Sequence, residues 1–153
     1  MQELFEVPEE RLDKVRELRL RILEAEKNTD FHGVVFSRKD SRFLLRFLRA
    51  RKFQVDRALQ LYLNYYKYRH KHSHLLGDLS LQSVQHVLQR GFFALLDTPS
   101  KCGSRTIVVF PARVDLEKIP PVDCLKALLL VLEAVIEDEE VQVRLSPLPV
   151  WPP

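Results

Sequence analysis

The sequence has 153 residues, of which 46% are hydrophobic and 29% charged, and these proportions fit a soluble globular chain. Its length allows one ordinary domain, or a small helical domain with part of another. Four glycines and nine prolines exclude a collagen-like or linker-dominated protein. The longest apolar run, residues 127–132, is much shorter than the roughly 20 residues of a membrane span, so we expect a buried helix there.

The net charge of +3 conceals an uneven distribution along the chain. Between Arg38 and His72, eleven lysines and arginines stand against two aspartates, which gives a local net charge of +9. The remainder of the chain carries a net charge of −6. A basic block within an otherwise acidic chain indicates an anionic partner, such as a phosphate or a membrane surface.

The first half of the chain has the apolar periodicity of helices. Four helices are predicted, over residues 9–27, 40–51, 57–70 and 80–91. Asp40, Asp56 and Ser80 are suitable N-caps, and Gly91 ends the fourth helix. The third helix should bury Ala58, Leu61, Tyr62, Tyr65 and Tyr68. Short helices with brief loops predict a small helical bundle.

The pattern changes after Gly91. Residues 92–96 and 106–110 are predicted as strands, 97–104 as a loop, and 122–139 as a long apolar helix. Two strands and one helix following a bundle indicate the opening of an α/β domain that is incomplete, since they cannot cover both faces of a sheet. As present, the fold class is therefore mainly α, or α+β. The proline-rich stretch 145–153 can form neither helix nor central strand.

The second predicted helix is basic and amphipathic. At about 100° per residue, four arginines fall within roughly 60° of one another, opposite Phe43, Leu44, Phe47 and Leu48. These arginines are Arg38, Arg42, Arg46 and Arg49. We expect the apolar side to pack into the bundle and the other side to present guanidinium groups, which bind phosphate well. A solvated charged surface is the alternative, but such a surface usually mixes both signs of charge.

The segment SRFLLRFLRARKFQVDRALQLYLNYYKYR, residues 41–69, resembles the CRAL-TRIO N-terminal domain of lipid-transfer proteins. Residues 91–115, GFFALLDTPSKCGSRTIVVFPARVD, are similar to the first strands of the CRAL-TRIO lipid-binding domain. Residues 119–143 resemble the helix that follows. The tocopherol-transfer and clavesin branch of the family is the most similar.

The resemblance implies an N-terminal helical domain over 9–78 and the start of a lipid-binding domain over 79–143. Residues 144–153 do not match the family pattern, so we expect a chain truncated within the lipid-binding domain, either as a splice product or through a wrong gene end.

The resemblance also implies two binding functions: a hydrophobic ligand, tocopherol-like or another lipid, and a phosphoinositide headgroup. Within the family, the second arginine of the Arg-Ala-Arg motif helps grip the headgroup, and this position is Arg51. The partial phosphoinositide site would consist of Arg51, Arg49, Lys52, Arg46 and Arg42. One wall of the lipid pocket would consist of Phe110, Leu125, Leu128, Leu129 and Leu132.

No nucleophile, phosphate-binding loop or metal spacing is present in the sequence, so we expect a protein that is not an enzyme and uses no cofactor or metal. We expect a monomer in the cytoplasm, peripheral on endosomal or other phosphoinositide-bearing membranes. An alternative is a fragment that acts only as a basic membrane- or protein-interaction module, without lipid transfer.

The sequence contains three weaker candidate sites. His70, His72 and His74 have a spacing that could bind metal, but neighbouring Lys71 and Arg69 disfavour a cation. The four tyrosines of the third helix could stack on nucleic acid, yet their helical spacing favours core packing. Cys102, in the predicted loop, could be reactive but has no base beside it in the sequence.

Overall fold

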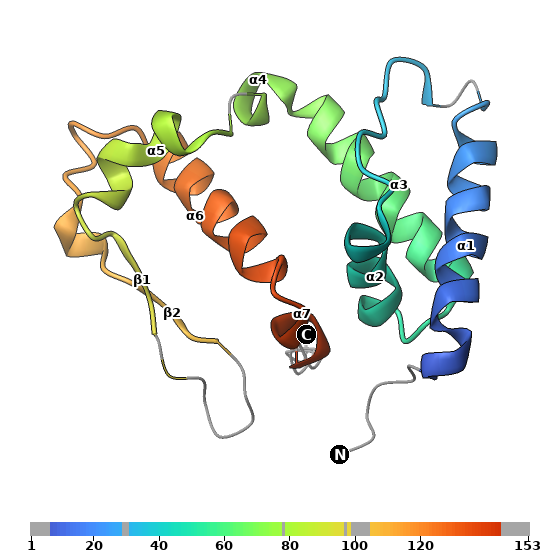
Figure 1. Cartoon of the computed structure of the whole chain (residues 1–153). Coiled ribbons are helices and arrows are strands. Elements are labelled where there is room, and N and C mark those ends of the chain that lie inside the picture. Colours follow the sequence, from blue (N-terminus) through green and yellow to red (C-terminus); the bar gives the residue numbers. More distant parts are fainter. Residues whose placement is uncertain (1–6, 29–30, 78, 97, 99–104, 145–153) are drawn as a thin grey trace, which may run out of the picture. The chain divides into compact units, whose positions relative to one another are not determined.

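The computed structural model describes residues 7–28, 31–77, 79–96, 98 and 105–144. The chain divides into two compact units, the first extending to His72 and the second from Ser73 to Arg144 (Figure 1). Cys102 and the proline-rich stretch 145–153 lie outside the described residues, as does most of the predicted loop 97–104. The assignment of residues 9–78 and 79–143 to two family domains stays a prediction.

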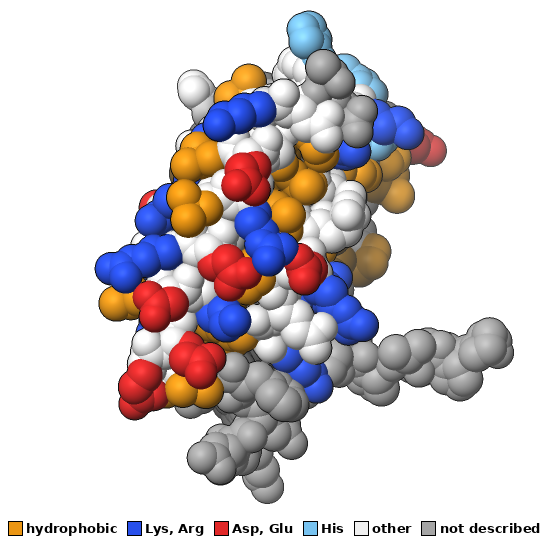
Figure 2. All heavy atoms as spheres, turned by 90° about the vertical axis from the view of Figure 1, so that its right-hand side faces the viewer, with side chains coloured by type: hydrophobic (Ala, Val, Ile, Leu, Met, Phe, Trp, Pro, Cys, Tyr) orange, Lys and Arg blue, Asp and Glu red, His pale blue; other side chains and the backbone are white. Residues whose placement is uncertain are grey.

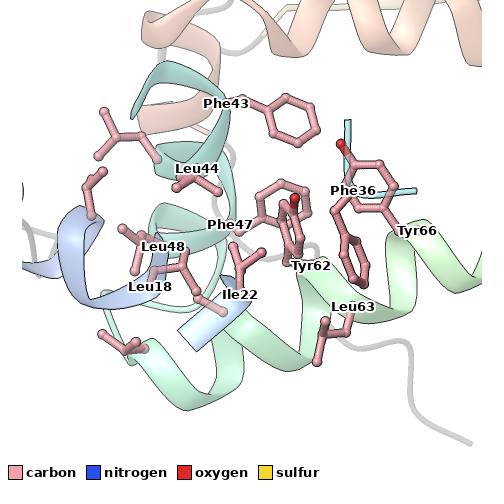
Figure 3. Close-up of a cluster of buried hydrophobic side chains, with 14 residues drawn as sticks. Leu18, Ile22, Phe36, Phe43, Leu44, Phe47, Leu48, Tyr62, Leu63 and Tyr66 are labelled. Atoms are coloured by element: carbon pink, nitrogen blue, oxygen red, sulfur yellow. The ribbon is translucent and has the colours of Figure 1, made fainter. Parts of the chain in front are cut away.

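The first unit is a bundle of three helices, α1 (Pro8–Ala25), α2 (Ser41–Ala50) and α3 (Val55–Lys71). The inward side of α1 buries Val15, Leu18 and Ile22, which pack against Leu44 and Leu48 of α2 (Figure 3). Each pair of these residues lies three or four positions apart, so one apolar stripe per helix faces the core. The predicted helical bundle is confirmed.

An aromatic cluster joins α2 to α3. Phe47 lies 5.2 Å from the ring of Tyr62, and Tyr62 lies 4.9 Å from Tyr66 (Figure 3). The Tyr62 hydroxyl donates to the Arg38 carbonyl at 2.9 Å, so this buried hydroxyl has a hydrogen-bond partner. Burial, followed by the neighbouring Tyr66, raises the pKa of Tyr62 above its ordinary value. The expected burial of Tyr68 is wrong, since 56% of this residue is exposed.

The beginning of α2 is fixed by a local cap. The Asp40 carboxylate accepts a hydrogen bond from the Phe43 amide at 3.0 Å, as the sequence predicts. Desolvation acts against ionisation of this carboxyl, but the Phe43 and Arg38 hydrogen bonds outweigh it and lower the pKa of Asp40. Ser80 caps α5 in the same way, accepting from the Ser83 amide at 3.2 Å.

The end of α2 is a tight turn of four residues. The amide of Phe53 donates to the Leu48 carbonyl at 2.8 Å, and that of Lys52 donates to Arg49 at 3.1 Å. This pair of bonds is a Schellman motif, in which the first residue beyond the cap is usually glycine in the left-handed region. Here that position is Lys52, at a φ of +51°, followed by Phe53 at +57°.

The second unit has a small core on which a two-stranded sheet and its helices converge. Its elements are α4 (Ser73–Leu76), α5 (Leu81–Leu88), β1 (Phe93–Leu95), β2 (Ile107–Val109), the 3-10 helix η2 (Pro111–Arg113), α6 (Pro121–Ile136) and α7 (Glu139–Arg144). The strands pair antiparallel, with Phe93 opposite Val109. The core comprises Val84, Val87, Val114, Ile119, Cys124 and Ala127. The predicted class, a helical domain followed by part of an α/β domain, is confirmed.

At two places that contain acidic residues, the helix boundaries differ from the predicted ones. The helix predicted over 122–139 would place the acidic residues 137–140 at its C-terminal end, where negative charge is unfavourable. Instead α6 ends at Ile136 with Glu137 as its C-cap, and a second helix begins at Glu139, so positions 139 and 140 lie in a first turn, which favours negative charge. Likewise Asp56 is not the N-cap of α3. Gln54 takes that position and Asp56 lies in the first turn.

Candidate functional site: a basic hollow at the turn between α2 and α3

An open hollow of about 390 Å³ lies where α2 ends and α3 begins. It is lined by Ala50, Arg51, Lys52, Gln54 and Arg57, and we call it the basic hollow. Three of the five lining residues are cationic and none is acidic.

The two arginines of the basic hollow are exposed, and few neighbouring groups offset their positive charge. One nitrogen of Arg51 donates to the Ala50 carbonyl at 3.1 Å. Among the residues that the structure describes, neither Arg51 nor Arg57 forms an ion pair with a carboxylate. Asp56, the acid next in sequence to Arg57, is paired with Arg21 of α1. The two arginines therefore bring positive charge to the hollow that no carboxylate of the described residues pairs with.

The N-terminus of α3 borders the basic hollow, because its N-cap residue Gln54 is one of the lining residues. The first intrahelical bond of α3 runs from the Ala58 amide to the Gln54 carbonyl at 2.9 Å, so the amides of 55–57 precede the helical ladder. Gln54 makes no side-chain cap bond to them. A helix N-terminus has the equivalent of about half a positive charge, which favours an anion.

The α1 surface of the same unit is different. Figure 2, which views the molecule from the side on which α1 lies in Figure 1, shows basic and acidic side chains interleaved. Arg16 bonds Asp13 at 3.2 Å, and Arg21 bonds Glu17 at 2.9 Å. Such mixed pairing is typical of a surface that serves solubility. The charge of the basic hollow does not follow this pattern.

Two of the predicted headgroup residues lie elsewhere. The expectation that Arg49 faces solvent is wrong, since it is 7% exposed. Arg46 is half-buried, with its guanidinium 4.0 Å from the centre of the Phe43 ring and 5.0 Å from those of Phe47 and Tyr65. These contacts are cation–π interactions, which hold the charge over the aromatic cluster. The guanidinium of Arg46 thus supports the fold, and the predicted four-arginine surface does not form.

Arg42 and Arg38 lie at the other end of α2. Arg42 is exposed in the first turn, nine residues from Arg51, which corresponds to about 13 Å along a helix. Arg38 precedes the helix and bonds Asp40 at 3.3 Å. Of the five predicted residues, the structure therefore brings Arg51 and Lys52 together in one hollow and adds Arg57, which the sequence pattern did not indicate. The short turn after Arg-Ala-Arg-Lys is the signal that could have suggested it.

The predicted wall of a lipid pocket lies in the second unit. Leu125 and Leu132 of α6 are 47% and 36% exposed, whereas Leu128 and Leu129 are half-buried. Phe110 is half-buried under the Arg113 guanidinium, which lies 4.4 Å from its ring centre. One face of α6 is thus apolar and partly open, while the opposite side packs Cys124 and Ala127 into the core. A larger open hollow of about 610 Å³ lies instead along α5, lined by Leu81, Gln82, Gln85, Leu88 and Gln89.

The structure gives little support to the weaker candidate sites. Within the described ranges, no three histidine, cysteine or acidic side chains lie close enough to hold a metal. Tyr62 and Tyr66 are buried in the core, so they offer no stacking surface for nucleic acid. Burial, followed by neighbouring Asp123, raises the pKa of the Cys124 thiol, which disfavours the reactive thiolate. None of the helices in the described part of the chain is both long and apolar enough to span a bilayer.

Residues 1–64 match the family model of the CRAL/TRIO N-terminal domain. The chain carries a CRAL/TRIO N-terminal domain. The basic hollow and the first ten residues of α3 lie within this matched stretch. The predicted resemblance to the family is therefore confirmed.

The sequence similarity to known proteins continues into the second unit. The alpha-tocopherol transfer protein-like proteins of Homo sapiens and Pongo abelii are each 36% identical over 143 residues, which cover 94% of this chain and 40% of the relative. Clavesin-2 of Rattus norvegicus is 38% identical over 111 residues, covering 71% of this chain and 34% of that protein. The chain thus spans about two fifths of the length of the tocopherol-transfer relatives that it matches.

Proposed function

We propose that this chain is a lipid-binding and transfer protein of the CRAL-TRIO family, with a hydrophobic ligand and an affinity for phosphoinositide membranes. The similarity to alpha-tocopherol transfer protein-like relatives over 143 residues carries the proposal. The name of those relatives makes a tocopherol-like molecule the first ligand to test. The proposal places the protein in the cytoplasm as a monomer, peripheral on endosomal or other phosphoinositide-bearing membranes.

Lipid transfer requires burial of the ligand and its release at a membrane, with no covalent step. Burial of apolar surface contributes about 25 cal/mol per Å², so even a partial pocket can hold an apolar chain. The open face of α6, with Leu125, Leu128, Leu129 and Leu132, supports a role as one wall of such a pocket. No residue is assigned a catalytic role, and the chain is proposed not to be an enzyme.

Membrane docking is proposed to use the basic hollow. Arg51, the position implied by the family resemblance, lines it together with Lys52. Phosphate monoesters carry about −1.5 to −2 charges each at neutral pH, and guanidinium groups bond them in pairs. Contacts of this kind contribute about 1 kcal/mol per basic residue near an anionic surface.

Vesicle sedimentation tests the docking step. Vesicles of phosphatidylcholine alone are compared with vesicles that also contain 5% phosphatidylinositol 4,5-bisphosphate, and with phosphatidylserine vesicles matched in total charge. The expected result is binding to the phosphoinositide vesicles that exceeds both others. Equal binding to all three would rule out headgroup recognition.

Extraction of the purified protein with organic solvent tests the ligand. A bound hydrophobic molecule, or uptake of fluorescent tocopherol, supports the transfer proposal. Phosphoinositide binding without any lipid uptake would favour the second candidate, a membrane-interaction module, which the exposed face of α6 makes worth testing.

A further inference from the structure

We propose that Arg57 is a phosphate-binding residue, which closes the basic hollow from the α3 side and acts with Arg51 and Lys52 on one phosphate monoester group. This inference rests on the proposed function and specifies the site: the anion lies at the turn between α2 and α3 and not along the length of α2.

The geometry of the turn brings the three cations together. Arg51 is the C-cap of α2, and Arg57 is the third residue of α3, so only the four residues 51–54 separate the two helices. Both arginines and Lys52 line the same hollow. The backbone of Lys52 is fixed by its bond to the Arg49 carbonyl and by that of the next amide to Leu48. The cations are therefore presented by ordered backbone, which lowers the entropic cost of binding.

Local helix physics does not explain Arg57. The first turn of a helix favours acidic residues, because the amides there carry partial positive charge. Asp56 follows this rule, but Arg57 stands against it, without a carboxylate partner among the described residues. A cation at a helix position that disfavours positive charge, with no carboxylate beside it among the described residues, is expected where an anionic ligand supplies the opposite charge.

The charge of the basic hollow selects the class of ligand. The two arginines, which have no carboxylate partner among the described residues, supply about +2 charges. One carboxylate compensates about half of this, whereas a phosphate monoester brings about −2 and three acceptor oxygens. Oxygens in this arrangement can accept from both guanidinium forks. A phosphorylated headgroup and a free phosphate ester share this chemistry.

The test uses the full chain in two arms. In the first, sedimentation with vesicles containing 5% phosphatidylinositol 4,5-bisphosphate compares the wild type with Arg57→Gln, Arg57→Lys, Arg51→Gln and a control, Arg16→Gln. Arg16 is an exposed arginine of α1, and its replacement changes the net charge equally. In the second arm, soluble inositol 1,4,5-trisphosphate is titrated while the amide signals of residues 54–57 are followed by NMR.

We expect Arg57→Gln and Arg51→Gln each to weaken vesicle binding about tenfold, the loss typical of one charge-assisted hydrogen bond. Arg57→Lys should recover part of the affinity, and Arg16→Gln should change it less than twofold. The melting temperature of Arg57→Gln should stay unchanged or rise, because the unfavourable charge at the N-terminus is removed. The trisphosphate should shift the amide signals of residues 54–57 in the wild type.

The two proposals can fail separately. If Arg51→Gln weakens vesicle binding while Arg57→Gln equals the Arg16→Gln control, the role of Arg57 is refuted and membrane docking stands. If the trisphosphate shifts the amides of residues 54–57 but vesicles do not bind, the hollow takes a free phosphate ester and the proposed docking fails. If Arg57→Gln lowers the melting temperature and the trisphosphate leaves those amides unmoved, Arg57 is structural and the inference is overturned.

Discussion

Replacing Lys52 by glycine should stabilise the first unit, although it removes a side chain of the proposed site. Lys52 adopts a φ of +51° as the first residue beyond the α2 cap. A residue with a Cβ in the left-handed region costs roughly 1–2 kcal/mol, because the Cβ approaches the following carbonyl oxygen. Glycine escapes this cost.

The gain is partly offset. Glycine loses more backbone entropy on folding than other residues, by roughly 0.5–1 kcal/mol relative to alanine. We therefore expect Lys52→Gly to stabilise the first unit by about 0.5–1 kcal/mol. For a domain of this size, 1 kcal/mol corresponds to about 4–8 °C in melting temperature. The expected rise is then about 2–8 °C.

Urea and thermal unfolding, followed through the amide signals of Leu44 and Leu48, measure the first unit separately from the second. Lys52→Ala is the matched control, because it removes the same charge and keeps the Cβ. Glycine should be more stable than alanine by about 1 kcal/mol, whereas within a helix the order is reversed. Equal stability of the two variants, or an advantage for alanine, would refute the assigned strain. Both should bind phosphoinositide vesicles more weakly than the wild type.

Three further changes test the first unit. Asp40→Ala removes the cap of α2 and should cost about 1 kcal/mol in urea unfolding; an unchanged midpoint would contradict the role of its bond to the Phe43 amide. Tyr62 ionises at higher pH when folded than when unfolded, so its stabilising contribution is present below about pH 10 and is lost above it, by up to about 1.4 kcal/mol per pH unit. The melting temperature of Tyr62→Phe should accordingly fall less steeply between pH 10 and 12 than that of the wild type, and parallel curves would dispute the shift. Arg46→Gln should lower stability by about 1–2 kcal/mol through lost cation–π contacts, yet reduce vesicle binding per folded molecule less than twofold; a larger binding loss with unchanged stability would return Arg46 to the headgroup site.

The helical sequence pattern predicted only part of the candidate site. The sequence indicated a basic segment and named Arg51 and Lys52, which line one hollow. It treated the arginines as one exposed row along α2, which is wrong for Arg49. Arg46 lies over Phe43 and Phe47 of its own helix and over Tyr65 of α3, and the position of Tyr65 depends on the packing of the two helices. Arg57 was missed because it belongs to α3, which only the turn brings near Arg51.

The sequence by itself determined the features whose causes lie within a few residues. Asp40 and Ser80 cap their helices through amides three positions away, and the apolar steps of α1 and α2 define their buried sides. The tertiary structure decided the rest. The tertiary packing of α2 buried Arg49, brought Tyr65 of α3 beside the Arg46 guanidinium, and required a turn so tight that Lys52 and Phe53 took left-handed backbone. Packing selects among conformations that a local pattern leaves nearly equal in energy, so the basic hollow arises only when the two helices meet.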